Sequence, residues 1–335
     1  MSFVSVGDLS QHYISQRNTG KIKTDLGRLG NELSLGQKAD VTKSMHGDTR
    51  ALTVLQHSLA TADSFLISVE TTTLTLTTVQ SVLGQVDSLR NALGNDLVLL
   101  SSGSNAAQID AASIKAKDQF GAIVSSLNQS WAGKPLFSGT ALDTVPLAAS
   151  DLMLADIVAT IPDPTDPVSV RTAVSDWFQD PAGGFATMGF LGNSDEQSVQ
   201  TGPNGQSVSY RVTADSDEIR QTLAAVALGA VVDMVGPSLT NQNRNMLLKE
   251  SGALSLGAAQ GMAHLQSRIG FTEEKLALSI SELAATKTTM SIAVNELVNS
   301  DPFETATRLE AAQRQLELHF TATARLSRMS LADYL

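Results

Sequence analysis

Residues 301–335 read DPFETATRLEAAQRQLELHFTATARLSRMSLADYL, and this stretch has the pattern of one long amphipathic helix. Asp301 is suited to cap a helix, Pro302 to occupy its first position, and Glu304 stands at the capping-box spacing. Apolar residues then recur every three or four positions, at Ala306, Leu309, Ala312, Leu316, Phe320, Ala324, Leu331 and Leu335. One face of a single helix is therefore apolar from end to end, and it needs a partner in this chain or in another.

The first 35 residues show the same property. Their apolar side chains recur at helical spacing, at Leu9, Tyr13, Ile22, Leu26, Leu29 and Leu33. Gly20, Gly27 and Gly30 interrupt this pattern, and each lowers helix propensity by roughly 1 kcal/mol relative to Ala. We expect a helix that is weak alone and forms when it is packed. The simplest partner for each terminal helix is the other one.

Three longer periodic runs lie between the two ends. From Ala51 to Leu100 the apolar residues keep a helical period, which predicts one helix of about fifty residues, or about 75 Å at 1.5 Å per residue. After a break at Ser101–Ser104, a second run extends from Ile109 to Trp131, and a third from Leu254 to Leu297. Runs of this length are typical of a coiled coil or a helical bundle.

The segment 136–250 has a different composition. It holds seven of the nine prolines, and its 14 acidic and 5 basic residues give it a charge of −9 out of −11 for the whole chain. Alternating apolar residues around Asn204-Gly205 predict a β-hairpin between Ser198 and Val212. The acidic residues of 215–218 precede an apolar helix that extends through Val232. We expect a separate α+β domain, inserted between two helical arms.

The sequence therefore predicts a mainly α protein, a long coiled-coil helical bundle formed by paired N- and C-terminal arms. Residues 1–40 and 300–335 form the paired terminal helices, and residues 41–135 and 251–299 form a bundle of long helices. Residues 136–250 form the inserted α+β domain that contains the β-hairpin.

Composition excludes several classes of function. A net charge of −11 argues against binding to nucleic acid or to anionic membrane surfaces. Cysteine is absent, which removes disulfides, zinc–thiolate sites and thiol catalysis. The first ten residues do not resemble a secretion signal, and the longest apolar run, Leu223 to Val232, is too short to span a bilayer. We expect no nucleic-acid partner and no membrane insertion.

No arrangement of residues in the sequence supports catalysis. The five histidines, His12, His46, His57, His264 and His319, do not occur in pairs at metal-ligand spacing. The glycine pairs match no phosphate-binding fingerprint. The aspartates of Asp163-Pro-Thr-Asp166-Pro could suggest a cation loop, but the prolines among them favour a turn. We expect no cofactor, no metal and no enzymatic activity.

Three segments resemble the flagellin-like family of flagellar axial proteins, and more closely its hook–filament junction proteins, the hook-associated protein 3 family. The first segment is the C-terminal stretch, with Thr307-Arg308-Leu309, Gln315-Leu316-Glu317, Thr323-Ala324-Arg325-Leu326-Ser327 and the ending Ser330-Leu331-Ala332-Asp333-Tyr334-Leu335. The second is Phe137-Ser138-Gly139-Thr140, at the exit from the second long helix. The ending and this second motif favour a junction protein over flagellin.

The third segment, Leu33-Ser34-Leu35-Gly36-Gln37-Lys38, is similar to a segment that follows the first helix in the family. The acidic element that usually comes next is missing, because this chain continues as Ala39-Asp40-Val41-Thr42-Lys43. The resemblance covers both helical arms and is weak across 136–250.

The resemblance implies a structural protein of the bacterial flagellum. Its terminal helices would pair as an inner coiled coil, and its middle segment would project outward. It would be exported unfolded through the flagellar type III channel, without a cleaved signal peptide, and would be extracellular. A cytoplasmic export chaperone would cover the C-terminal helix before export. The protein would then self-assemble as a ring between hook-associated protein 1 and the first flagellin subunits.

The helical stripes supply a hypothesis for the assembly and partner interface. Its residues are Leu9, Ile22, Leu26, Leu33, Leu309, Leu316, Phe320, Leu326, Leu331 and Leu335. Among them, Leu309, Leu316 and Phe320 are expected to face the N-terminal helix. Leu331 and Leu335 are expected to face a neighbouring subunit or the chaperone.

Three alternatives remain at this point. The first is flagellin, the filament subunit, which would have the same fold. The second is an adhesin or enzyme whose activity lies in 136–250. The third is a cytoplasmic coiled-coil scaffold, which fits the periodicity but leaves the motif matches as coincidences.

Overall fold

The computed structural model describes residues 6–203 and 205–332. The helices in these ranges are α1 (Val6–Leu35), α2 (Val41–Ser44), α3 (Arg50–Val98), α4 (Ala106–Leu127), α5 (Ser150–Thr160), α6 (Pro167–Gln179), α7 (Asp217–Val235), α8 (Asn241–Gly257), α9 (Ala259–Val298) and α10 (Pro302–Ala332). Two antiparallel hairpins accompany them, β1 (Ser130–Trp131) with β2 (Lys134–Pro135) and β3 (Gln197–Gln200) with β4 (Ser207–Tyr210). The predicted mainly α fold with a small β component is confirmed.

The chain divides into two compact units. Unit 1 contains residues 1–61 and 285–335, and unit 2 contains residues 62–284. Helices α3 and α9 each carry residues of both units. The three-part division at residues 40, 135, 250 and 299 stays a prediction.

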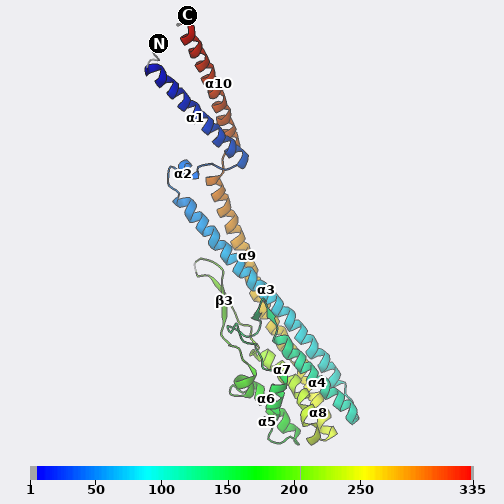
Figure 1. The fold of residues 1–335 in the computed structure, drawn as a ribbon. Helices are drawn as coiled ribbons and strands as arrows, with labels where there is room; N and C mark the ends of the chain where they lie inside the picture. Colours follow the sequence, from blue (N-terminus) through cyan, green and yellow to red (C-terminus); the bar gives the residue numbers. More distant parts are fainter. Residues whose placement is uncertain (1–5, 204, 333–335) are drawn as a thin grey trace. The chain divides into compact units, whose positions relative to one another are not determined.

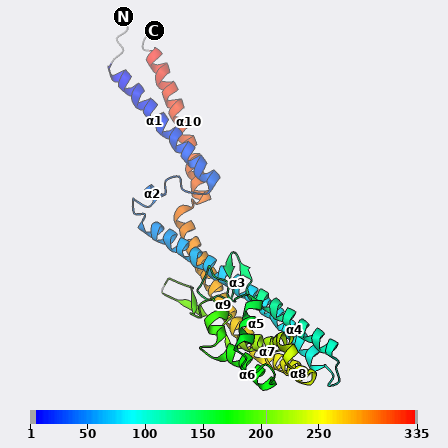
Figure 2. The ribbon, with the colours of Figure 1, turned by 60° about the horizontal axis from the view of Figure 1, so that its bottom comes forward.

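In unit 1, α1 and α10 lie side by side and run antiparallel (Figures 1 and 2). Asp301 caps α10 as the sequence predicts, because its Oδ1 accepts the backbone N–H groups of Phe303 at 2.8 Å and Glu304 at 3.2 Å. The Glu304 carboxylate pairs with Arg308, one turn along the helix, at 2.5 Å. The start of α10 is therefore fixed by local hydrogen bonds, whereas the rest of the helix depends on packing.

Unit 2 is built around α7, whose residues are buried almost continuously from Ile219 to Val235. Helices α4, α5, α6 and α8 pack against it. The stretch Asp217–Ser238 is long and apolar enough to cross a membrane by length and composition, but most of it is buried inside the protein. It is a core helix, longer than the apolar run that marks it in the sequence.

One continuous hydrophobic core extends through unit 2. Leu83 of α3, Phe120 of α4, Phe178 of α6 and Leu276 of α9 all belong to it, together with the buried residues of α7. The segment 136–250 contributes α5, α6, α7 and part of α8 to this core. In the structure the helices of that segment and the long helices bury one shared core, because α7 is apolar on every side and must be covered all round.

Several predicted elements have different ends in the structure. Trp131 lies in β1 rather than in the second long helix, because α4 ends at Leu127 and the Asn128 side chain bonds both the N–H and the carbonyl of Leu147. The third run starts earlier, at Asn241 in α8, and is interrupted between α8 and α9. The long helix α3, with 49 residues, and the β3–β4 hairpin are confirmed. Asn204 of the hairpin turn lies outside the described residues.

The turn Phe137–Thr140 anchors the segment that follows β2. Phe137 is buried and its carbonyl accepts the N–H of Ala214 at 2.9 Å, while the Ser138 carbonyl accepts the N–H of Asn193 at 2.9 Å. Gly139 has a φ of +67°, and a Cβ added there would lie 1.8 Å from the carbonyl oxygen of Asn193. Only glycine fits this position, since it needs both a left-handed backbone and space beside the Asn193 carbonyl.

We predict that Gly139→Ala lowers the free energy of unfolding of unit 2 by about 3 kcal/mol, because both the backbone and the neighbouring segment must shift. Both tryptophans of the chain, Trp131 and Trp177, lie in unit 2, so urea unfolding followed by tryptophan fluorescence measures the change. Gly103→Ala is the control, because the nearest atom to its added Cβ is the Ser101 hydroxyl at 3.8 Å. Equal effects of the two substitutions would contradict this account of the turn.

Candidate assembly interface

The contact between α1 and α10 is a narrow apolar seam. Ile22 and Leu29 of α1 are buried, Leu26 is half-buried, and the four α10 residues that complete the seam are Thr305, Leu309, Ala312 and Leu316. These residues recur every three or four positions, so each helix contributes a single stripe. We call these seven residues the terminal seam. It leaves the opposite side of each helix uncovered by the other.

Beyond Ile22 and Leu316 the contact becomes polar. The Thr19 Oγ1 lies 3.3 Å from the His319 Nδ1, and the Ser15 Oγ lies 3.5 Å from the Thr323 Oγ1. The Thr19 hydroxyl already donates its hydrogen to the Ser15 carbonyl at 3.0 Å, so in the contact with His319 the Nδ1–H donates. Toward the ends of the chain the two helices are thus joined by hydroxyl and imidazole groups rather than by buried apolar area.

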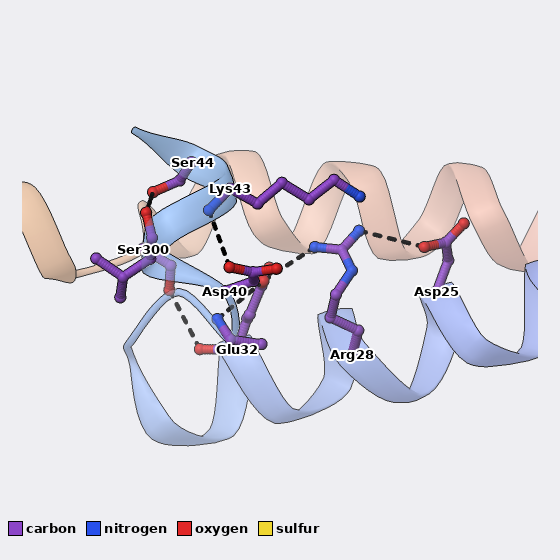
Figure 3. Close-up of polar contacts among 9 residues, drawn as sticks. Asp25, Arg28, Glu32, Asp40, Lys43, Ser44 and Ser300 are labelled. Carbon is purple, nitrogen blue, oxygen red and sulfur yellow. Dashed lines mark hydrogen bonds and ion pairs between the residues drawn. The ribbon is translucent and has the colours of Figure 1, made fainter. Parts of the chain in front are cut away.

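At the other end of the seam, Glu32 is the centre of a hydrogen-bond cluster (Figure 3). Its side chain is only slightly exposed, and Oε1 accepts from the Arg28 Nη1 at 2.9 Å and from the Ala39 N–H at 3.1 Å. Arg28 also pairs with Asp25 at 3.4 Å. A buried carboxylate is costly unless it is paired and hydrogen-bonded, and here both conditions are met.

The segment Leu33–Lys38 ties the end of α1 to the junction between α9 and α10. The Ser300 Oγ donates to the Glu32 carbonyl at 3.2 Å, and the Ser300 N–H donates to the Gly36 carbonyl at 3.0 Å. Lys38 donates through its backbone N–H to the Val298 carbonyl and through Nζ to the Leu297 carbonyl, both at 2.9 Å. These are the last carbonyls of α9, which have no partner within the helix and attract a cation.

Directly after this segment the chain forms the short capped helix α2. Asp40 accepts the Lys43 N–H at 2.9 Å and starts α2. The turn before it has Gly36 at a φ of +69°, which favours glycine.

The structure places the predicted interface residues in three groups. Ile22, Leu26, Leu309 and Leu316 lie in the terminal seam. Leu33 and Phe320 are exposed, Phe320 by 51%, because His319 occupies the seam position beside it. The structure does not describe the side chains of Leu9, Leu326 and Leu331 or any part of Leu335. The assignment of these residues to an interface stays a prediction.

Sequence reasoning missed the apolar residues on the outer side of the pair. Phe303 is 83% exposed, Leu318 is 71% exposed, and Tyr13 is also exposed on α1. Phe303 and Leu318 stand outside the apolar stripe of α10, so periodicity does not reveal them, whereas Tyr13 belongs to the stripe predicted for the N-terminal helix. These side chains are exposed in the single chain and are available for contact with another molecule.

The aspartates that could have indicated a cation loop have local roles. Asp163 accepts from both the N–H and the hydroxyl of Thr165, and these hydrogen bonds lower the pKa of its carboxyl group. Asp166 caps α6 through the N–H groups of Val168 and Ser169. The turn interpretation therefore fits the geometry. In the part of the chain that the structure describes, no group of His, Asp and Glu side chains could hold a metal ion.

Comparison with known proteins connects the C-terminal helices to the flagellum. Residues 256–335 match the model of the bacterial flagellin C-terminal helical region. No sequence among the curated proteins matches this chain significantly.

Among solved structures, a Vibrio parahaemolyticus protein described as a flagellar hook-associated protein aligns at 17% identity and a TM-score of 0.43, over 73% of this chain and 95% of its own. FlgL from Bacillus cereus aligns at 13% identity and a TM-score of 0.23, over 81% of this chain and 99% of its own. Both TM-scores are low, so the match of residues 256–335 carries the functional argument. It supports a structural, non-enzymatic role in the bacterial flagellum.

We predict that Glu32→Ala lowers the free energy of local unfolding of the segment that follows α1 by about 1–3 kcal/mol, because the Ala39 N–H and the Arg28 guanidinium lose their acceptor. Hydrogen exchange of the amides in 33–40 measures this local change. Asp25→Ala is the matched control, since Asp25 is the exposed partner of the same arginine; a change within about 0.5 kcal/mol is expected there. If both variants exchange alike, Glu32 does not hold this end of the pair.

Proposed function

We propose that this chain is a structural subunit of the bacterial flagellum. It would assemble through its terminal helix pair, α1 and α10, and would be located at the junction between hook and filament. The observation that carries the proposal is the terminal pair itself. Helices α1 and α10 cover one stripe of each other and leave Phe303 and Leu318 on the outside. The match of α9 and α10 to the flagellin C-terminal helical region supports the same role.

Assembly would complete the packing that the single chain lacks. A Cβ added at Gly20, Gly27 or Gly30 of α1 would meet no atom within 4 Å, so nothing in this chain requires glycine there. Each glycine nevertheless lowers helix stability by about 1 kcal/mol relative to Ala. Helices of this kind are stabilised mainly by the surfaces that cover them. Neighbouring subunits would supply those surfaces, and folding of the pair would be coupled to incorporation.

The position at the junction rests on two sequence segments. The Phe137–Thr140 turn and the ending Ser330–Leu335 resemble junction proteins more closely than flagellin. The chain would contact hook-associated protein 1 on one side, flagellin on the other, and copies of itself within a ring. Before export a cytoplasmic chaperone would cover α10. The protein would pass through the type III channel without losing a signal peptide and would act outside the cell.

Flagellin is the second candidate, and one observation favours it. The matching family model is that of flagellin, and it covers α9 and α10 but not unit 2 as a whole. A filament subunit and a junction subunit would share the terminal pair. They differ in the number of copies and in what each one contacts.

Deletion of the gene in its own host, followed by electron microscopy and an assay for flagellin in the medium, distinguishes the two. The proposal predicts bare hooks and flagellin shed into the medium, because exported subunits would have nothing to build on. Bare hooks without flagellin anywhere would identify this chain as the flagellin. Normal filaments in a host that carries no second copy of the gene would contradict both candidates.

A further inference from the structure

Arg90 is a buried charge in the middle of α3. Its side chain is 1% exposed, and its guanidinium is held by Asp87, with Nη2 at 2.6 Å and Nε at 3.2 Å from Oδ1. The remaining nitrogen, Nη1, donates to the backbone carbonyl of Ser255 in α8. An arginine is seldom fully buried, and this one is turned toward a main-chain carbonyl of another helix.

Two glycines let the helices approach closely enough for this contact. A Cβ added at Gly94 would lie 2.9 Å from the Leu256 side chain and 3.2 Å from the Gly252 carbonyl oxygen. A Cβ added at Gly252 would lie 2.8 Å from the Cβ of Leu97. Helices α3 and α8 therefore cross with their backbones nearly in contact, one turn away from Arg90 and Ser255.

The Ser255 carbonyl lies at a break in the helix. Helix α8 ends at Gly257 and α9 begins at Ala259, with Ala258 between them. The Ala258 N–H still bonds the Leu254 carbonyl at 3.0 Å, and the Met262 N–H bonds the Ala258 carbonyl at 3.1 Å. In an uninterrupted helix the Ser255 carbonyl would accept the N–H of Ala259. Here it accepts the guanidinium of Arg90.

Proline and a left-handed backbone do not cause this break, whereas Ser255 and Gly257 lower the helix propensity around it. The residues from Ser255 to Gly261 contain no proline, and the backbone of Ala258 is right-handed, with φ −69° and ψ −8°. A Cβ added at Gly257 would meet nothing within 4 Å, so Gly257 is not required by close packing. A side chain that inserts into the backbone hydrogen-bond ladder is a known cause of such breaks.

We propose that Arg90 sets the position of the break between α8 and α9 by taking the Ser255 carbonyl out of the helical ladder. Asp87 orients the Arg90 guanidinium, and the close crossing of α3 and α8 at Gly94 and Gly252 brings the guanidinium within hydrogen-bond distance of the Ser255 carbonyl. Arg90 is thus a positioning residue. It lets α8 pack against α4 and α7 as a helix of the core, while α9 continues beside α3, where the Gln80 side chain bonds the Gln266 carbonyl at 2.8 Å. This inference applies whether the chain is a junction protein or a flagellin.

The test is backbone hydrogen exchange across residues 256–265 in the full-length protein. In the wild type the amides of Ala259, Gln260 and Gly261 should exchange faster than those of Met262 to Leu265, because they begin a new helix. Arg90→Met replaces the buried cation by an apolar side chain of similar length, and the Asp87 carboxylate that it leaves behind is 39% exposed and open to hydration. In R90M the Ser255 carbonyl becomes free for the Ala259 N–H, the helices merge, and exchange at the three amides slows by at least about tenfold.

Slower exchange is a readout that general destabilisation would not produce, since destabilisation makes exchange faster. Arg90→Lys keeps one donor and should keep the break. Asn91→Met, on the exposed side of the same turn of α3, should change nothing. If R90M does not fold, D87A is measured instead; without an acceptor at position 87 the guanidinium is no longer held toward the Ser255 carbonyl, and exchange at the three amides should also slow. Protected amides at 259–261 in the wild type, or unchanged fast exchange in a folded R90M or D87A, would overturn the proposal.

Discussion

The terminal seam between α1 and α10 is the contact on which the proposed function of the protein depends. An amphipathic helix gains its stability from the surface that covers its apolar side, and in this chain each terminal helix can cover only one stripe of the other. The seam is apolar from Ile22 to Leu29 and polar at Thr19 and His319. Next to the seam, the Ser300 hydroxyl donates to the Glu32 carbonyl and ties the end of α1 to the junction between α9 and α10. Its outer side is left for another molecule.

In unit 2, one helix is covered by other helices on all sides. Helix α7 is buried almost throughout by α4, α5, α6 and α8, and its apolar residues belong to a core that reaches from α3 to α9. The two units therefore represent two ways of meeting the same requirement. Unit 2 buries a continuous core within the chain, and under the proposed function the terminal helices of unit 1 gain further burial in the assembly. The strongly acidic segment 136–250 belongs to unit 2.

Features set by local sequence could be predicted, and features set by contacts between distant residues could not. The length of α3, the β3–β4 hairpin and the cap at Asp301 follow from periodicity and from turn and capping residues close together in the chain. The break at Ala258 was missed, because it depends on Arg90, which lies 165 residues away from Ser255. The core that the 136–250 segment shares with the long helices likewise depends on contacts between distant residues. Periodicity shows that a surface must be covered, but not by which segment.

In the candidate interface, too, some residues could be predicted from the local pattern and others could not. The stripes on the terminal helices gave Ile22, Leu26, Leu309 and Leu316, which lie in the seam, but they also gave Phe320, which lies outside it. A difference of one residue changes the direction of a helical side chain by about 100° and decides between the seam and its flank. The exposed residues Phe303 and Leu318 carry no periodic signal, and only the pairing of the helices shows that they are left uncovered.

A comparison of Leu318→Asp with Leu316→Asp tests the central claim most directly, because the first side chain lies outside the seam and the second lies in it. Each variant is expressed in a host that lacks the gene; its amount in isolated flagella is measured by immunoblot, and hydrogen exchange of α1 and α10 is measured on the purified protein. The account predicts that L318D leaves exchange in the free protein unchanged and is absent from flagella, whereas L316D speeds exchange in both helices. Normal incorporation of L318D would contradict the claim that the outer side of the terminal pair is the assembly surface.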